Sequence, residues 1–303
     1  DEITPAQVMD LWPVEAVPAT RQWLVENLSG GVLTDVSAAV RMAPGATPRV
    51  GVTYAFDDAQ VRFMTQMPVI EGARGHASLY DDAYSMRVSG GKVTPEGGAA
   101  LDITGTTVLI SGLEQKPARM DLGLRAAGPL ESVLRMLDNP PFEVSQTSGF
   151  AVDTVEATAA IAAEVGFDLN KVIPKDAVEY LVTGTLSDVS SSVLVPGRTI
   201  EAERLAVAVG PGLVEVEGPA MLDGVELEIS VAQPFGPEKL PARVDGQIEL
   251  SPNMLEAFGI GLPPGTVGGR GTGDFTLDLP PEGGVPRFTL TSDLGGMTMQ
   301  VAP

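Results

Sequence analysis

Apolar and polar residues alternate strictly along several stretches of this chain, and this period-two pattern constrains the fold more than any other feature. The alternating apolar positions are Val50, Val52, Tyr54 and Phe56, then Leu205, Val207 and Val209, then Val225, Leu227, Ile229 and Val231, and finally Phe275, Leu277, Leu279, Phe288 and Leu290. Successive side chains of a β-strand point to opposite faces, so the pattern is typical of strands buried on one face. Among the 303 residues, 35 glycines and 25 prolines supply turns. The sequence therefore predicts a mainly β fold of antiparallel sheet.

Helices are expected to be few and short. Helix signals occur at Thr4-Pro5, from Pro18 to Leu28 with Gly30 as the stop, from Pro129 to Leu137, and at Ser251-Pro252. The alanine-rich segment 154–167 also keeps period two, and we predict a strand there.

Turn chemistry is concentrated at four places. Hairpin turns are predicted at Asp57-Asp58, at Asp81-Asp82 and in the segment LPPEGGVP at 279–286. The segment GGRGTGDF at 268–275 lacks the Lys-Ser/Thr pair of a phosphate-binding loop. It is interpreted as a flexible turn.

A sheet with one apolar face creates a geometric problem. Four short helices are too few to cover that face, so the sheet must curl on itself, pair face to face with another sheet, or keep an open groove. The pattern alone leaves these three solutions open.

Two pairs of similar segments indicate an internal repeat. GVLTDVSAAV at 31–40 matches GTLSDVSSSV at 184–193 in six of ten positions. A second pair follows in the same order, since the segments beginning at Pro117 and Pro241 each run from Pro-Ala-Arg through an apolar stretch to Pro-Pro. We predict two divergent units, 1–150 and 151–303, forming one continuous structure.

The charge balance restricts the partners. Lys and Arg total 19 against 40 Asp and Glu, a formal net charge of −21, so nothing would neutralise a phosphate backbone and nucleic acid is a poor candidate. An anionic membrane surface would be repelled too, although an apolar groove could accept a lipid tail without electrostatic help.

Candidate catalytic groups are scarce. The chain has no cysteine, which removes disulfides and thiolate chemistry, and its one histidine, His76, excludes two-histidine zinc sites. Neighbouring carboxylates at Asp57-Asp58 or Asp81-Asp82 point apart and do not suit glycoside hydrolysis. We expect no enzyme activity, no cofactor and no metal; turnover that depends on His76 would revive an enzymatic interpretation.

Several segments resemble the AsmA-like envelope proteins of the YhdP and TamB type from Gram-negative bacteria. The resemblance is carried by LWPVEAVPATRQWLVENLSGGVLTDVSAAV, PVIEGARGHASLYDDAYSMRVSGGKV, LRAAGPLESVLRMLDNPP, VEYLVTGTLSDVS, LVEVEGPAMLDGVELEISV and PRFTLTSDLGGMTMQVAP, in this order along nearly the whole chain.

The resemblance implies an elongated, twisted antiparallel β-sheet that forms an open groove with an apolar concave face. It also implies periplasmic localisation and conduction of phospholipids between the inner and outer membranes, as part of a parent chain anchored in the inner membrane, with an outer-membrane partner as one possibility. No run approaches the roughly 20 apolar residues of a membrane-spanning helix, so we expect this chain to be an internal portion of such a protein. The family brings no catalytic residues.

The hypothesis that follows is a lipid-conducting groove lined by the alternating apolar side chains. These are Val50, Val52, Tyr54, Phe56, Leu205, Val207, Val209, Leu227, Ile229, Val231, Phe275, Leu277, Leu279, Phe288 and Leu290. The alternative, from a different class, is a closed β-sandwich acting as a structural spacer or adhesion module without lipid cargo.

Overall fold

The computed structural model describes residues 2–11, 18–45, 49–64, 66–139, 153–170, 173–174, 177–195, 197–236, 240–263, 265–280 and 285–300. The helices are α1 (Pro5–Leu11), α2 (Pro18–Asn27), α3 (Leu130–Leu137) and α5 (Pro252–Ala257). The strands are β1 (Leu28–Arg41), β2 (Arg49–Val61), β3 (Ile70–Tyr80), β4 (Ala83–Val93), β5 (Leu101–Asp102), β6 (Thr107–Ser111), β7 (Arg119–Pro129), β8 (Glu156–Asp168), β9 (Glu179–Ser191), β10 (Ile200–Gly210), β11 (Leu213–Leu222), β12 (Val225–Pro234), β13 (Ala242–Leu250), β14 (Val267–Gly269), β15 (Gly271–Leu279), β16 (Arg287–Thr291) and β17 (Met297–Met299).

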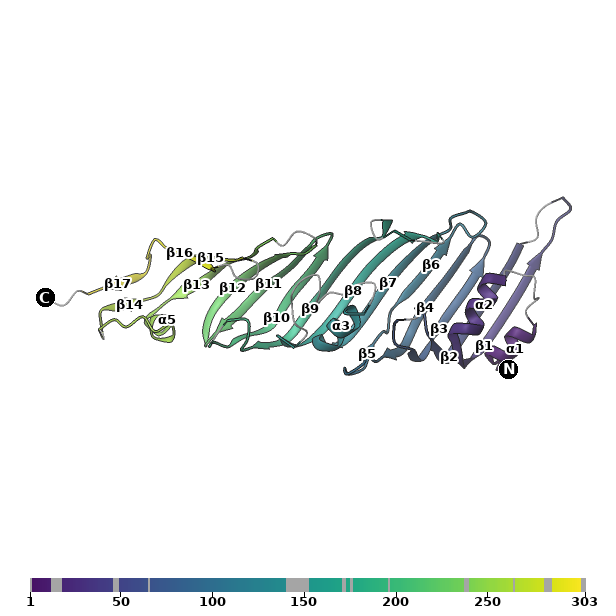
Figure 1. Cartoon of the computed structure of the whole chain (residues 1–303), viewed down its shortest axis with the longest axis horizontal. Coiled ribbons are helices and arrows are strands. Elements are labelled where there is room, and N and C mark those ends of the chain that lie inside the picture. Colours follow the sequence, from purple (N-terminus) through teal and green to yellow (C-terminus); the bar gives the residue numbers. More distant parts are fainter. Residues whose placement is uncertain are drawn as a thin grey trace. The chain divides into compact units, whose positions relative to one another are not determined.

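One sheet of 15 strands contains most of these strands (Figure 1). Its order follows the chain from β1 to β13 and then β15 and β16, with β6 placed beside β4 and β7, while β14 and β17 form a separate two-stranded ribbon. Neighbouring strands run antiparallel, as short connections between consecutive strands require. The prediction of a mainly β fold, with an antiparallel sheet and few short helices, is confirmed.

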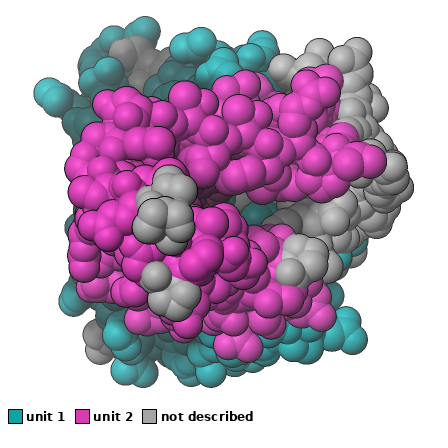
Figure 2. Space-filling model, turned by 90° about the vertical axis from the view of Figure 1, so that its left-hand side faces the viewer, with its two compact units in different colours: residues 1–142, 160–182 teal, residues 143–159, 183–303 magenta. Residues whose placement is uncertain are grey.

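The chain divides into two compact units, shown in different colours in Figure 2. Unit 1 comprises residues 1–142 and 160–182, and unit 2 comprises residues 143–159 and 183–303. Each unit is described by itself below.

In unit 2 the register sorts side chains by polarity. Directly opposed residues of antiparallel strands point to the same face. Val216 lies opposite Val207 and Val231, and Val244 lies opposite Val231 and Leu277. On the other face, Glu228 lies opposite Gln247 and Asp245 opposite Thr276. The same pairings continue through β16, so β10 to β13, β15 and β16 share one apolar face and one polar face.

Unit 1 is sorted in the same way. Val52 lies opposite Leu79, which lies opposite Tyr84, and Tyr84 lies opposite Ile110 of β6. The other face carries residues such as Ser78 and Ser85, whose hydroxyls lie 2.8 Å apart.

The repeated Asp-Val-Ser motif marks a local backbone feature. Asp35 and Asp188 occupy equivalent motif positions, and both have positive φ, 52° and 53°. In β1 the register with β2 shifts between Thr34 and Ser37, so Asp35 lies in a β-bulge. Asp is one of the few non-glycine residues that enters this region readily, which explains why the motif keeps it.

The second repeated pair also has a structural counterpart. The segments from Pro117 and Pro241 each form a strand followed directly by a helix, β7 with α3 and β13 with α5. Ser251 caps α5, because its side chain accepts a hydrogen bond from the Met254 backbone N–H.

Several local predictions are confirmed. The helices at Pro5, Pro18, 130–137 and Pro252 are present. The alanine-rich segment 154–167 forms β8, and Asp81-Asp82 is the two-residue turn between β3 and β4.

Other local predictions are wrong. Asp57-Asp58 lies inside β2, where Asp58 has a φ of 50° and the register with β3 shifts between Phe56 and Ala59, so the pair forms a bulge and not a hairpin turn. Gly30 lies inside β1 and is not the stop of α2, which ends at Asn27. GGRGTGDF is mostly strand, since β14 ends at Gly269 and β15 begins at Gly271. Of the turn predicted at 279–286, residues 281–284 lie outside the described residues.

Candidate functional site

The apolar face of unit 2 is one candidate surface. The residues that the register and the period-two alternation place on it are Leu205, Val207 and Val209 of β10, Val214, Val216 and Ala220 of β11, Val225, Leu227, Ile229 and Val231 of β12, Ala242, Val244, Ile248 and Leu250 of β13, Phe275, Leu277 and Leu279 of β15, and Phe288 and Leu290 of β16. All eleven unit 2 residues of the predicted groove lining share this face. Figure 2 shows the described atoms of unit 2 curving around a hollow.

Exposure varies widely over this face. Leu205, Leu227 and Ile229 are buried, whereas Phe288 is 59% exposed. Val207 and Val231 lie between these extremes. The face therefore combines a packed central part with apolar side chains that still reach solvent at β16.

In unit 1 the four predicted lining residues of β2 also share one face. Val50, Val52, Tyr54 and Phe56 lie opposite or beside apolar residues of β1 and β3. Phe56 is buried with Ala59 and Ala73, while Val50 is 44% exposed. The apolar face of unit 1 is thus closed at the Phe56 end of β2 and open at the Val50 end.

Helices cover little of these faces. The main helix contacts are those of α1 and α2 with β1, of α3 with β7, and of α5 with β12, β13 and β14. Over the described part of the chain, the strands form the large sheet and the β14–β17 ribbon, which offers no second large layer to close a sandwich.

Each unit holds a phenylalanine against a cross-strand glycine on its apolar face. Phe56 lies opposite Gly75, and Phe275 lies opposite Gly246. A Cβ atom at Gly246 would come within 2.7 Å of the Phe275 ring, and one at Gly75 within 2.8 Å of the Phe56 ring. Glycine therefore lets an aromatic ring lie flat against the sheet, and Phe275 extends this surface by stacking on Phe288 with ring centroids 6.0 Å apart.

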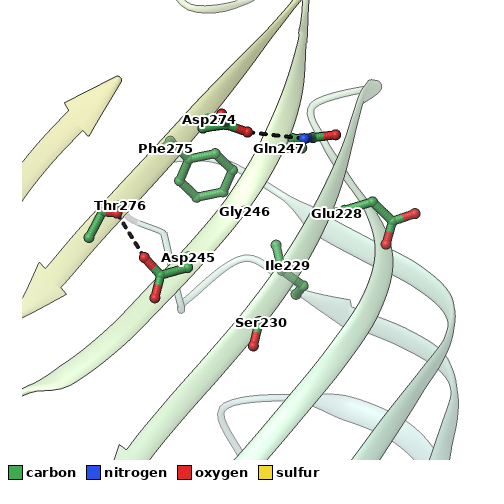
Figure 3. A pocket seen from close by; sticks show the side chains of 9 residues that line it. All are labelled: Glu228, Ile229, Ser230, Asp245, Gly246, Gln247, Asp274, Phe275 and Thr276. Atoms are coloured by element: carbon green, nitrogen blue, oxygen red, sulfur yellow. Dashed lines mark hydrogen bonds between the residues drawn. The ribbon is translucent and has the colours of Figure 1, made fainter. Parts of the chain in front are cut away.

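A shallow depression of about 440 Å³ lies around Gly246 (Figure 3). Its six polar lining residues belong to the polar face of β12, β13 and β15: Glu228, Ser230, Asp245, Gln247, Asp274 and Thr276. Thr276 donates to Asp245 at 2.8 Å and Gln247 donates to Asp274 at 3.0 Å. The Arg243 guanidinium and the Thr276 hydroxyl lower the pKa of Asp245. The two hydrogen bonds connect β13 to β15 across the polar face.

Two tyrosine hydroxyl groups lie on the apolar face of unit 1. The hydroxyls of Tyr54 and Tyr84 lie 3.1 Å apart. Burial raises the pKa of both phenols, so both remain protonated at neutral pH. Tyr54 belongs to the predicted lining, but Tyr84 does not, although Tyr84, Met86 and Val88 alternate with polar residues in β4 until two glycines interrupt the pattern.

Other candidate groups remain isolated. His76 lies on the polar face of unit 1, opposite Ala55 and Arg87. Within the described residues, no cluster of three or more His, Asp and Glu could hold a metal ion. In the same part of the chain, no helix has the length and apolar character needed to cross a membrane.

The lining residues of β11 and β13 were not predicted from the sequence. Val214 and Val216 alternate only briefly before Gly218 and Pro219, and in β13 Gly246 interrupts the apolar series. Both strands follow the period-two pattern if glycine is allowed at the apolar positions.

Comparisons with protein-family models, with curated proteins and with solved structures found no match for this chain.

Proposed function

We propose that the apolar face of the sheet binds the acyl chains of phospholipids and lets them move along it. The observation that carries the proposal is the register of unit 2, which gathers aliphatic and aromatic side chains from six strands, β10 to β13, β15 and β16, on one face. Each buried methylene contributes roughly 0.8 kcal/mol. Because hydrocarbon packing is non-directional, such a surface would hold acyl chains without binding them at one fixed position.

The cellular setting in this proposal rests on the resemblance to AsmA-like proteins. The chain would act in the periplasm, as a portion of a longer protein anchored in the inner membrane, and conduct phospholipids between the inner and outer membranes. It would need no catalytic residue and no cofactor. The net charge of −21 favours lipid uptake through burial of the tails over attraction to anionic headgroups.

Two neighbouring substitutions in β12 test the proposal. Val231 is half-buried on the apolar face, and the adjacent Ala232 lies on the polar face opposite Arg243. In Val231→Asp an uncompensated carboxylate would stand among apolar side chains, which is costly, whereas in Ala232→Asp the new carboxylate would lie on the polar face between Glu215 and Arg243. We expect Val231→Asp to lower co-purified phospholipid severalfold and Ala232→Asp to leave it unchanged, as measured by native mass spectrometry with lipid extraction.

Equal lipid content in the two variants would contradict the assignment of the face. A wild-type chain that carries no lipid would favour the structural-module alternative. Far-UV circular dichroism of both variants checks that each one folds.

A further inference from the structure

The tyrosine pair of unit 1 joins two strands that are not neighbours. Tyr54 lies on β2 opposite Ala77 of β3, and Tyr84 lies on β4 opposite Leu79 of the same strand. The two side chains therefore reach toward each other across β3, and their oxygens meet at 3.1 Å. The small side chain of Ala77, 5% exposed, leaves room for this crossing.

The hydrogen bond between the two tyrosines uses only one of their two hydroxyl protons. Each phenol carries one O–H donor, and the bond between the two oxygens consumes one of the two protons. Burial raises the pKa of both groups, so neither proton is lost at neutral pH. One O–H donor therefore remains available, and both side chains are only partly buried.

The surroundings specify what this donor can bind. The other positions that the cross-strand pairings place on this face of β2, β3, β4 and β6 carry aliphatic or aromatic side chains or are glycines: Val50, Val52, Phe56, Ala59, Val61, Ile70, Ala73, Gly75, Ala77, Leu79, Met86, Val88, Val93, Val108 and Ile110. None of these positions carries a cation, so a carboxylate or phosphate oxygen would enter without charge compensation, which is unfavourable. A neutral acceptor flanked by hydrocarbon fits best.

We propose that the Tyr54–Tyr84 pair donates a hydrogen bond to the ester carbonyl of a bound acyl lipid. This inference rests on the proposed function and deepens it, because it distinguishes ester-linked lipids from other apolar molecules. The pair gives an otherwise apolar face one point of polar recognition, at which the ester group of a lipid rests while its chains lie along the face.

The test compares an ester-linked phosphatidylethanolamine with its ether-linked analogue of the same chain length, because the ether lacks the carbonyl acceptor. A single net hydrogen bond corresponds to a roughly threefold to tenfold difference in affinity. We expect the wild-type chain to prefer the ester lipid by that factor in a displacement assay. The double variant Tyr54→Phe/Tyr84→Phe, which keeps both rings, is expected to bind both lipids equally.

The single variants separate recognition from packing. In Tyr54→Phe the remaining Tyr84 hydroxyl loses its partner but keeps its proton, and the same holds for Tyr54 in Tyr84→Phe. Each single variant should therefore retain the ester preference, which only the double variant loses. An ester preference in the double variant as large as in the wild type would overturn the inference.

A second measurement does not depend on the variants. With a ¹³C-labelled ester carbonyl, the infrared stretch of the lipid bound to the wild-type chain should lie at lower frequency than in hydrocarbon solvent, as for a hydrogen-bonded carbonyl. An unshifted band would refute the inference. Binding of both lipids with equal affinity by the wild type would refute the inference alone, whereas binding of neither would refute the proposed function as well.

Discussion

Aspartate with left-handed backbone geometry recurs in this chain. Asp35, Asp58, Asp81, Asp188 and Asp223 all have φ between 50° and 53°. Positive φ at aspartate is common in turns, but Asp35, Asp58 and Asp188 lie inside strands, and at Asp35 and Asp58 the register with the neighbouring strand is irregular. The repeated Asp-Val-Ser motif is therefore a signature of backbone geometry.

Asp188 offers a test of this geometry, because its side chain is exposed. Replacing it with Val should lower the free energy of unfolding by about 1–2 kcal/mol, since a β-branched residue is strained at positive φ. Replacement with Gly or Asn should change the stability little. Urea denaturation measures all three variants, and a Val variant as stable as the Gly variant would contradict the backbone explanation.

Gly246 tests the contact between aromatic ring and backbone. A Cβ at this position would lie 2.2 Å from the Glu228 carbonyl oxygen and 2.7 Å from the Phe275 ring. Gly246→Ala should therefore cost about 1–3 kcal/mol of stability through overpacking. Gly210→Ala is the matched control, because a Cβ there meets nothing within 4 Å. Similar unfolding curves for the two variants would contradict the close packing of Phe275.

At the scale of elements, Arg198 ties three parts of unit 2 together. Its guanidinium donates to the Asp223 carboxylate at 2.7 Å and to the Ala257 carbonyl at 2.9 Å, and it lies 4.3 Å from the centre of the Phe258 ring. Asp223 in turn accepts from the Thr199 backbone N–H. Arg198 thus connects the residues before β10, the turn between β11 and β12, and the end of α5.

This cluster predicts a pH dependence. The Thr199 N–H, with a further contribution from Arg198, lowers the pKa of Asp223. A carboxyl whose pKa is lower in the folded chain stabilises the fold above its unfolded value of about 4, and this contribution is lost as pH falls through the folded value. Asp223→Asn should therefore be less stable than the wild type at neutral pH, and the difference should shrink below about pH 4. A constant difference in urea midpoint across this range would exclude the linkage.

The alternation predicted the elements better than their boundaries. Period two identified β2, β10, β12 and β15 because one face of each is apolar, and tertiary contacts reinforced that preference. The bulge at Asp57-Asp58 was not predictable from local signals, since the same residue types favour turns and bulges alike.

Glycines were misread for a related reason. Near the predicted stop of α2, Gly31 has a φ of 109°, and a Cβ there would lie 2.7 Å from the Ala59 Cα atom of the neighbouring strand. Its role is close approach between strands, which depends on a partner far away in the sequence. The contact between Tyr54 and Tyr84 also depends on residues far apart in the sequence, so local patterns did not predict it.

In the molecule as a whole, the separation of polar and apolar side chains onto opposite faces of the sheet supports the proposed function. In each unit the charged and hydroxyl side chains are directed mainly to one face of the sheet and the aliphatic ones to the other. Charged side chains, among them the Arg243–Asp245 pair at 2.6 Å, keep the polar face of unit 2 hydrated. The apolar face keeps side chains that reach solvent, which is unusual for a surface without a partner.

Site-specific photo-crosslinking to lipid is the sharpest test of acyl-chain binding at the apolar face. A photoreactive amino acid at the position of Val216, Val231 or Leu277, on the apolar face, or of Ala232, Thr276 or Glu217, on the polar face, would be activated in cells labelled with radioactive phosphate. Labelled lipid adducts are expected from the three apolar-face positions and none from the three polar-face positions. Adducts from both faces alike, or from neither, would contradict acyl-chain binding at the apolar face.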